Sequence, residues 1–395
     1  MDALLDDDEI QIRDQARAFL TDNCPPVLVR RHEHEGGFAR ELWQQVIDLG
    51  WLDTCLPEAL DGLELPISYM CLLLEEQGRA IAPLPLLSTI VPALLLADHG
   101  SDAQKALIAK MRTGEALFCF SLQDAQGGWN KGASGLSGRI EGDELVLSGT
   151  RGFADNFEHA SHVLVSFDGD EGPALALIAT DATGLSATAL VPMTKESQAC
   201  LRFDALRVPK SAILAGGAAA VEQAKNLAAL FAASYMAGAA RKATELTTTY
   251  VSERDAFGQP IGAFQAIQHT AADMIIGVDG TELLAREAAW RYAQGEDVGV
   301  FVSQAKAFAN DKCVFVARSA QQLHGGIGFI IEFDIQLYYR RIVSHALRFG
   351  TSHEHRARVA DRILSFDHKI RNDWSAMPEA SGKLVPSAAR LGLHF

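Results

Sequence analysis

One segment in the last third of the chain carries residue types that could hold an anion. It begins Arg254-Asp-Ala-Phe257 and continues through a glycine and a proline to Phe264-Gln265. An arginine at the end of one helix and the free backbone amides at the start of the next can bind a charged group such as a pyrophosphate. The same residues also fit a capped turn between two helices, so their spacing leaves both interpretations open.

A second segment places three glycines at the end of a long helical stretch: Gln322-Leu-His-Gly325-Gly326-Ile-Gly328-Phe329. Glycines allow a backbone to approach a ligand or another chain closely, because they carry no Cβ. They are equally suited to ending a helix in a tight turn. Alone, this segment does not distinguish a binding site from a helix end.

The signatures of common nucleotide-binding proteins and hydrolases are missing from the sequence. There is no G-x-G-x-x-G after a strand, no phosphate-binding loop with Gly-Lys, no H-E-x-x-H and no G-x-S-x-G. Two histidine pairs, His32 with His34 and His353 with His355, each bracket a glutamate in a polar stretch. We predict that both pairs lie on solvated faces and that the chain binds no metal.

The composition is that of a folded globular protein. The chain has 395 residues, enough for two or three domains, with 48% hydrophobic residues and a formal net charge of −15. This charge disfavours nucleic acid and membrane surfaces as partners. The amino terminus lacks the features of a signal peptide, no run reaches the length of a membrane span, and the six cysteines include no C-x-x-C pair. We therefore predict a cytoplasmic location with reduced thiols.

The hydrophobic period changes twice along the chain. Residues 1–117 have helical spacing, residues 118–217 alternate with a period of two, and residues 218–365 return to the helical period in longer stretches. We expect an N-terminal helical domain, a middle β-domain, a C-terminal helical bundle and a tail over residues 366–395. The first helix is predicted to begin at an acidic cap, Asp6 to Asp8. Further N-terminal helices are predicted over residues 42–49, 67–81, 88–98 and 102–113.

With this order of elements, the two segments resemble the acyl-CoA dehydrogenase family over residues 1–365. The family shows R-x-x-F-G-x-x-(I/L)-x-x-x-Q, matched from Arg254 to Gln265, and Q-(I/L)-x-G-G-x-G-(F/Y), matched from Gln322 to Phe329. It also shows R-(D/R)-x₇-E-G-T, which here reads Arg340-Arg-Ile-Val-Ser-His-Ala-Leu-Arg-Phe-Gly-Thr. The resemblance implies an α+β multi-domain fold with an N-terminal helical domain, a middle antiparallel β-domain and a C-terminal four-helix bundle.

The resemblance also implies non-covalent FAD, with each flavin shared between two subunits. The residues implied to contact the flavin of a neighbouring subunit are Arg254, Phe257, Phe264, Gln265, Gln322, Gly325 and Gly326. Those implied to contact the flavin of their own subunit are Ser121, Phe153, Thr351 and Ser352. Two β-domain segments depart from the family pattern: the loop from Leu122 to Gly127, and Asp155, which stands where a hydroxyl would bond the flavin. The implied partners are an acyl-CoA thioester and an electron-transferring flavoprotein or a similar acceptor.

The family's catalytic base has no counterpart in this sequence. Family chemistry removes a proton beside the thioester with a carboxylate while a hydride passes to the flavin. Most members carry that glutamate immediately before Gly-Thr, where this chain has Phe349. Other members carry it 26 residues before the Arg254-type arginine, where this chain has Ala228. No catalytic residue is therefore assigned to this chain.

Three explanations remain open on the sequence. The chain is the non-catalytic half of a heteromeric (α₂β₂) dehydrogenase whose paralogous partner supplies the glutamate; such enzymes act on bulky, steroid-derived acyl-CoA thioesters. Alternatively, Glu354 or Glu332 is an unorthodox base in a homotetramer, or the chain is a flavin-dependent oxidase or monooxygenase that needs no such base. A scaffold without flavin is the non-enzyme alternative.

Overall fold

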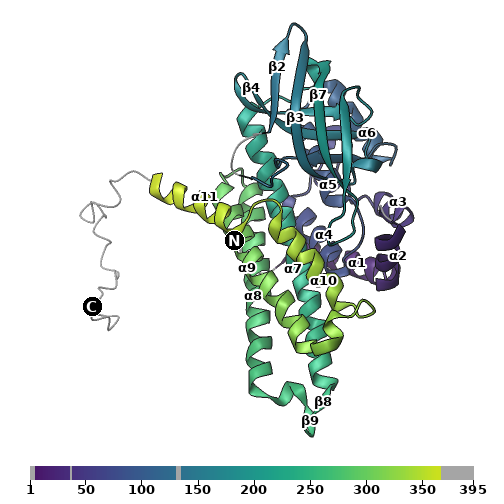
Figure 1. The fold of residues 1–395 in the computed structure, drawn as a ribbon, viewed down its shortest axis with the longest axis vertical. Coiled ribbons are helices and arrows are strands. Elements are labelled where there is room, and N and C mark those ends of the chain that lie inside the picture. The colour runs from purple at the N-terminus through teal and green to yellow at the C-terminus, as the bar shows by residue number, and fades with distance from the viewer. Residues whose placement is uncertain (1–4, 36–37, 130–134, 366–395) are drawn as a thin grey trace, which may run out of the picture.

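The computed structural model describes residues 5–35, 38–129 and 135–365. Along this part of the chain, helices come first, a β-sheet follows, and long helices complete the fold (Figure 1). The secondary structure changes to strand between Arg112 and Phe118 and returns to helix after Pro209. The division into domains at these positions stays a prediction, and the predicted tail lies outside the described residues. Among the described helices, none combines the length and hydropathy needed to cross a bilayer.

The N-terminal helices begin at the predicted acidic cap. Asp6 accepts a hydrogen bond from the Glu9 backbone N–H at 2.8 Å, and the Glu9 carboxylate accepts one from the Asp6 N–H at 3.2 Å, which forms a capping box. The α2 helix was not expected; it begins at Pro26, a residue whose fixed φ suits the first helical position. The bounds are α1 Asp7–Asn23, α2 Pro26–Glu35, α3 Arg40–Asp48, α4 Ile67–Ala80, α5 Leu86–His99 and α6 Asp102–Arg112.

The middle strands form one curled sheet, in the order β1-β4-β2-β3-β7-β6, with β5 also paired to β4. Hairpins join β2 to β3 at Glu141 to Glu144 and β4 to β5 at Gly169 to Gly172. The expected antiparallel arrangement holds for these pairs, but β1 and β2 run parallel to β4. Since β2 and β3 separate β1 from β4 along the chain, a tight turn does not fix their relative direction. The bounds are β1 Phe118–Ser121, β2 Leu136–Glu141, β3 Glu144–Asp155, β4 His162–Gly169, β5 Gly172–Ala179, β6 Leu185–Leu190 and β7 Gln198–Pro209.

Long helices α7 to α10 form the predicted bundle, which extends away from the sheet (Figure 1). The alanines of α7 from Ala220 to Ala243 are buried in the bundle, and their small size permits close helix packing. A short hairpin of β8 Asp255–Ala256 and β9 Gln259–Pro260 caps the far end. The helix bounds are α7 Gly217–Glu253, α8 Gln265–Ala293, α9 Gly299–His324, α10 Ile335–Leu347 and α11 Ser352–Ser365.

Helices α4 and α7 cross with their backbones in contact. A Cβ on Gly78 would lie 2.0 Å from the Tyr235 carbonyl oxygen, and a Cβ on Gly238 would lie 1.7 Å from the Glu75 carbonyl oxygen. Any side chain larger than hydrogen would therefore force the helices apart. The two glycines join the N-terminal helices directly to the bundle.

Candidate functional site

The two motifs singled out in the sequence meet at one end of the bundle. The first follows the end of α7 and the second follows the end of α9. Tyr250, near the end of α7, stacks on His324, the last residue of α9, with ring centroids 4.4 Å apart. Helix packing thus brings together residues that are some seventy positions apart in sequence.

This end of the bundle presents its predicted binding residues outward. Phe257 is 95% exposed at the tip of the β8–β9 hairpin, with φ +56°. A left-handed φ is costly for a bulky residue, and such strain is characteristic of ligand sites. Gly325 and Gly326 are open, because a Cβ at either would meet no atom within 4 Å. Arg254, Gln265 and Gln322 are exposed as well, and Phe264 packs edge-on against Phe257 at 6.2 Å.

The residues implied to contact a flavin within their own subunit lie elsewhere. Asn310 bonds the Gly350 carbonyl, whereas Gln322 is twelve residues further along α9, about 18 Å away at 1.5 Å per residue. Ser121 is buried, and its hydroxyl donates to the Gly152 carbonyl at 2.5 Å. Phe153 has φ +59°. The two groups of predicted residues therefore lie in different parts of the structure and do not form one site within a single chain.

Phe349, at the expected position of the base, is a buried plug. It is 2% exposed, with φ +57°. Its ring lies 6.0 Å from Phe120 on β1 and 6.0 Å from the edge-on indole of Trp129. Three aromatic rings therefore fill the space in which the family's carboxylate is expected.

The turn that carries Phe349 is held from behind by buried polar groups. The Lys306 ammonium donates to the His345 carbonyl at 2.9 Å, and Asn310 donates to the Gly350 carbonyl at 3.0 Å. His355 Nε2 bonds the Phe349 carbonyl at 2.8 Å. The turn is therefore fixed from both α9 and α11.

His355 corrects one prediction, since it is fully buried rather than on a solvated face; His353 is exposed. Burial, and then the nearby Lys306 ammonium, lowers the pKa of His355 to about 3. The ring is therefore neutral at pH 7 and donates its Nε2 proton to the carbonyl. Burial likewise lowers the pKa of Lys306 to about 7. The described residues contain no cluster of three or more side chains that could hold a metal ion.

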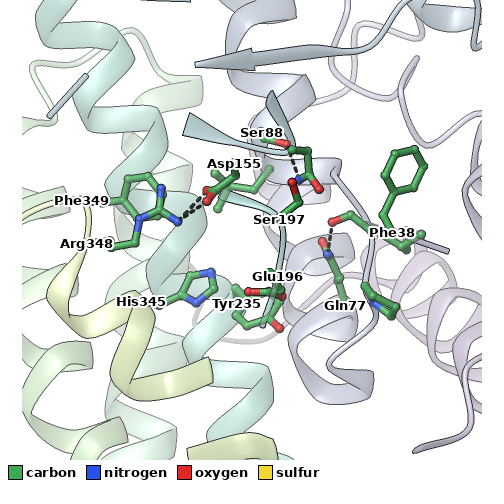
Figure 2. Close-up of a pocket in the computed structure, with 14 residues that line it drawn as sticks. Phe38, Gln77, Ser88, Asp155, Glu196, Ser197, Tyr235, His345, Arg348 and Phe349 are labelled. Carbon is green, nitrogen blue, oxygen red and sulfur yellow. Dashed lines mark hydrogen bonds and ion pairs between the residues drawn. The ribbon is translucent and has the colours of Figure 1, made fainter. Parts of the chain in front are cut away.

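An ion pair joins the sheet to the bundle beside Phe349 (Figure 2). Arg348 Nη1 lies 2.6 Å from Asp155 Oδ2, and Arg348 Nη2 donates to the Phe153 carbonyl at 3.0 Å. Gln198 donates to the same Asp155 carboxylate at 2.9 Å. Asp155 is thus occupied by protein donors at the position where the family resemblance implied a flavin contact.

The pocket next to this ion pair is small. It lies between α4, α5, α7, α10 and the end of β3, and has a volume of about 60 Å³. That is room for about two water molecules, whereas small-molecule sites have volumes of about 300–1,000 Å³. Its lining includes Tyr235 and His345, whose rings stack at 4.3 Å (Figure 2). Burial, and then Arg348, lowers the pKa of His345 to about 4, so this ring is also neutral.

Neither of the two alternative bases faces this pocket. The Glu354 carboxylate accepts hydrogen bonds from the backbone N–H groups of Trp129 at 2.9 Å and Thr351 at 3.0 Å. Glu354 forms the capping box of α11 with Thr351: its carboxylate accepts a hydrogen bond from the Thr351 hydroxyl, and its backbone N–H donates one to that hydroxyl. Glu332 is exposed and does not line the pocket. Ala228, the second base position, is fully buried within α7.

The hydroxyls implied to bind the flavin of their own subunit already have partners. Thr351 Oγ donates to Glu354 at 3.0 Å, and Ser352 Oγ donates to Asp311 at 2.7 Å. An anionic cofactor at this helix start would meet two carboxylates. Each of the three predicted hydroxyls, those of Ser121, Thr351 and Ser352, therefore donates a hydrogen bond to a group of this chain.

Sequence reasoning missed the residues that close this region. Trp129 follows a loop in which Asp124 accepts the Gln126 and Gly128 amides at 2.8 and 2.9 Å, and that loop directs the indole inward. Lys306 and Asn310 are spaced i, i+4 among the many small and apolar residues of α9, which was an available signal of a buried polar pair. Nothing local in the sequence announces the pairing of Arg348 with Asp155, 193 positions away.

Comparisons with known proteins agree on one family. The model described as acyl-CoA dehydrogenase, N-terminal domain, matches residues 6–115, and the model of the C-terminal domain matches residues 215–364. The mitochondrial short-chain specific acyl-CoA dehydrogenase of Bos taurus is 27% identical over 368 residues, 89% of each chain. A chain of a Tcur3481-Tcur3483 steroid ACAD variant is 31% identical, with TM-score 0.86 over 90% of this chain and 98% of that one. A chain of the ChsE4-ChsE5 complex from Mycobacterium tuberculosis is 25% identical, with TM-score 0.88 over 93% of this chain and all of that one.

Proposed function

The chain belongs to the acyl-CoA dehydrogenase family, and from this premise we propose that it is the subunit of a heteromeric dehydrogenase that lacks the catalytic base. A paralogous partner chain supplies the glutamate. The observation that carries this proposal is Phe349, a buried plug at the position where the base is expected. The 60 Å³ pocket supports the same conclusion, because it is too small for an acyl-CoA thioester.

The two structural relatives suggest the kind of assembly and substrate. One is a steroid ACAD named for two components, and the other is a complex of two named chains. We extend both features to this chain: a heterotetramer with a paralogue, acting on a bulky, steroid-derived acyl-CoA thioester in the cytoplasm. An electron-transferring flavoprotein or a similar acceptor would reoxidise the complex.

FAD is the cofactor of the complex, and when bound it accepts the hydride from the β-carbon of the thioester. The open end of the bundle fits such a group. Arg254 is exposed and has no ion-pair partner within the described residues, which supports our proposal that it binds the pyrophosphate of a flavin held by the partner chain. Phe257 offers a free aromatic face, and Gly325 with Gly326 leaves room for a close backbone approach.

The other half of the family's flavin site does not fit. Phe349 and Trp129 fill the space beside β1, and Arg348 holds Asp155. We therefore propose one flavin for each pair of unlike chains, bound by the partner and completed by this chain. In this proposal the open end of this chain's bundle binds the flavin that the partner chain holds, and proton abstraction takes place in the partner's pocket.

The test is to compare this chain alone with its complex with a glutamate-bearing paralogue. We expect no dehydrogenation of butyryl-CoA or of a steroid-side-chain thioester by the chain alone, because loss of a positioned base costs about 10²–10⁴ in rate. The complex should be yellow and active, with one FAD for two chains. Turnover by the chain alone, abolished by Glu354→Gln, would establish the unorthodox base instead. A complex without flavin would favour the scaffold alternative.

The cross-subunit contact is tested by Arg254→Ala in the complex. A charge-assisted contact of about 1.5–3 kcal/mol corresponds to flavin binding about 10- to 150-fold weaker. Arg202→Ala is the matched control, because Arg202 is an exposed arginine on β7, away from this end of the bundle. Equal flavin content in the two variants would contradict the pyrophosphate contact.

A further inference from the structure

Buried polar side chains hold the turn at Phe349 and Gly350 in a strained backbone conformation. Both residues have left-handed backbone, with φ +57° and +94°. Such a conformation is strained at a residue other than glycine and persists only where the surroundings impose it. Here Lys306, Asn310 and His355 impose it by bonding the turn's carbonyl groups. The backbone of residues 349 and 350 is thus bonded by three buried side chains, none of which contacts it through the Phe349 ring.

The group next to that side chain is a cation. The Arg348 guanidinium carbon lies 4.6 Å from the centre of the Phe349 ring. Its side chain is only 13% exposed, so water screens it weakly. A glutamate at position 349 would place its carboxylate inside the volume that the ring now occupies. That carboxylate would lie against Arg348.

We propose that Arg348 is a second block to base chemistry in this chain, acting as a positioning residue that would hold any carboxylate at position 349 in an ion pair. The inference rests on the proposed function, since it explains why restoring the carboxylate alone would not restore a base. In the present chain the same guanidinium is occupied by Asp155.

The groups that face position 349 define what else could influence a carboxylate there. Arg348 is the nearest cation, and Lys306 lies behind the turn, while His345 and His355 are neutral at pH 7 because burial lowers the pKa of each. The other titratable groups packed around this region are Asp155, Glu196 and Tyr235 beside the pocket, and Lys225 and Glu354, which bond the Trp129 backbone.

The test compares Phe349→Glu with Phe349→Gln in the full-length chain, each with and without Arg348→Met. Glutamate and glutamine have the same shape, so the difference in unfolding stability within a pair reports the ionisation of the introduced carboxyl group. With Arg348 present, we expect this difference to stay flat from pH 5 to pH 8, because an ion pair keeps the pKa at or below its ordinary value. In the Arg348→Met background, burial should dominate and raise the pKa. The folding equilibrium should then fall tenfold for each pKa unit gained as pH rises over the same range.

A falling difference in both backgrounds, or a flat one in both, would overturn the proposal. If the glutamate variants do not fold, Phe349→Cys provides the same test with a smaller side chain. Its thiol pKa, measured by peptide-resolved alkylation against pH, should be lower with Arg348 than with Arg348→Met. Equal thiol pKa values would also overturn the proposal. Neither measurement depends on turnover or flavin content, so failure here is distinct from failure of the proposed function.

Discussion

Two phenylalanines with the same backbone strain and opposite burial provide the sharpest test of the site. Phe349 and Phe257 have φ +57° and +56°, but the first is 2% exposed and the second 95%. Replacing either by alanine leaves the left-handed strain in place, so the strain cancels in the comparison. Removing a buried phenylalanine costs about 3–5 kcal/mol of unfolding free energy, whereas a surface change costs within about 0.5 kcal/mol.

We expect Phe349→Ala to destabilise the chain by about 3–5 kcal/mol and Phe257→Ala to change its stability hardly at all. Urea unfolding of the purified chain measures both. In the complex, by contrast, Phe257→Ala should have the larger effect on flavin retention, and it should release flavin faster than the unchanged complex. If Phe349→Ala cost less than about 1 kcal/mol, the ring would not fill a packed space, and the plug interpretation would be refuted.

Two further expectations follow from buried features of the helices. Burial, and then the neighbouring Glu282, raises the pKa of Glu75 to about 7. Its contribution to the free energy of unfolding is therefore fully present below about pH 4.5, where the carboxyl group is protonated in both states, and is lost as the pH rises through 7. Glu75→Gln should therefore exceed the unchanged chain in stability by up to about 3 kcal/mol at pH 8 and by less than about 1 kcal/mol at pH 5, in thermal unfolding, with the exposed Glu171→Gln as control. Gly238→Ala should cost about 3 kcal/mol or more, because its Cβ would lie 1.7 Å from a carbonyl oxygen, while Gly326→Ala, with nothing within 4 Å, should unfold like the unchanged chain.

The architecture could be predicted largely because its signals are local. The acidic start of α1, the apolar periods of α4 to α6 and the two hairpin turns of the sheet each act within a few residues. The α2 helix was missed, although Pro26 stands at its first position and proline favours the first turn of a helix. The parallel pairing of β1 with β4 was missed because strands that share no turn have no local signal of direction.

The site divides in the same way. The glycines and the arginine of the open bundle end lie within two short motifs that a sequence can show. The closed half depends on contacts between distant positions: Arg348 with Asp155, Trp129 with Phe349, and His355 with the Phe349 carbonyl. The solvated face predicted for His355 was wrong because its polar neighbours in sequence suggested water, whereas the fold turns the ring inward beneath the turn.

The glycine crossing of α4 and α7 limits how the small pocket could ever grow. Both helices form walls of the pocket, and their backbones touch at Gly78 and Gly238. A protein interior transmits displacement rather than absorbing it, so these two walls must shift as one piece. Enlarging the pocket by moving the end of β3 would instead break the ion pair between Arg348 and Asp155. The two sides of the pocket are thus held differently: α4 and α7 by direct backbone contact, and the sheet and the end of α10 by one ion pair.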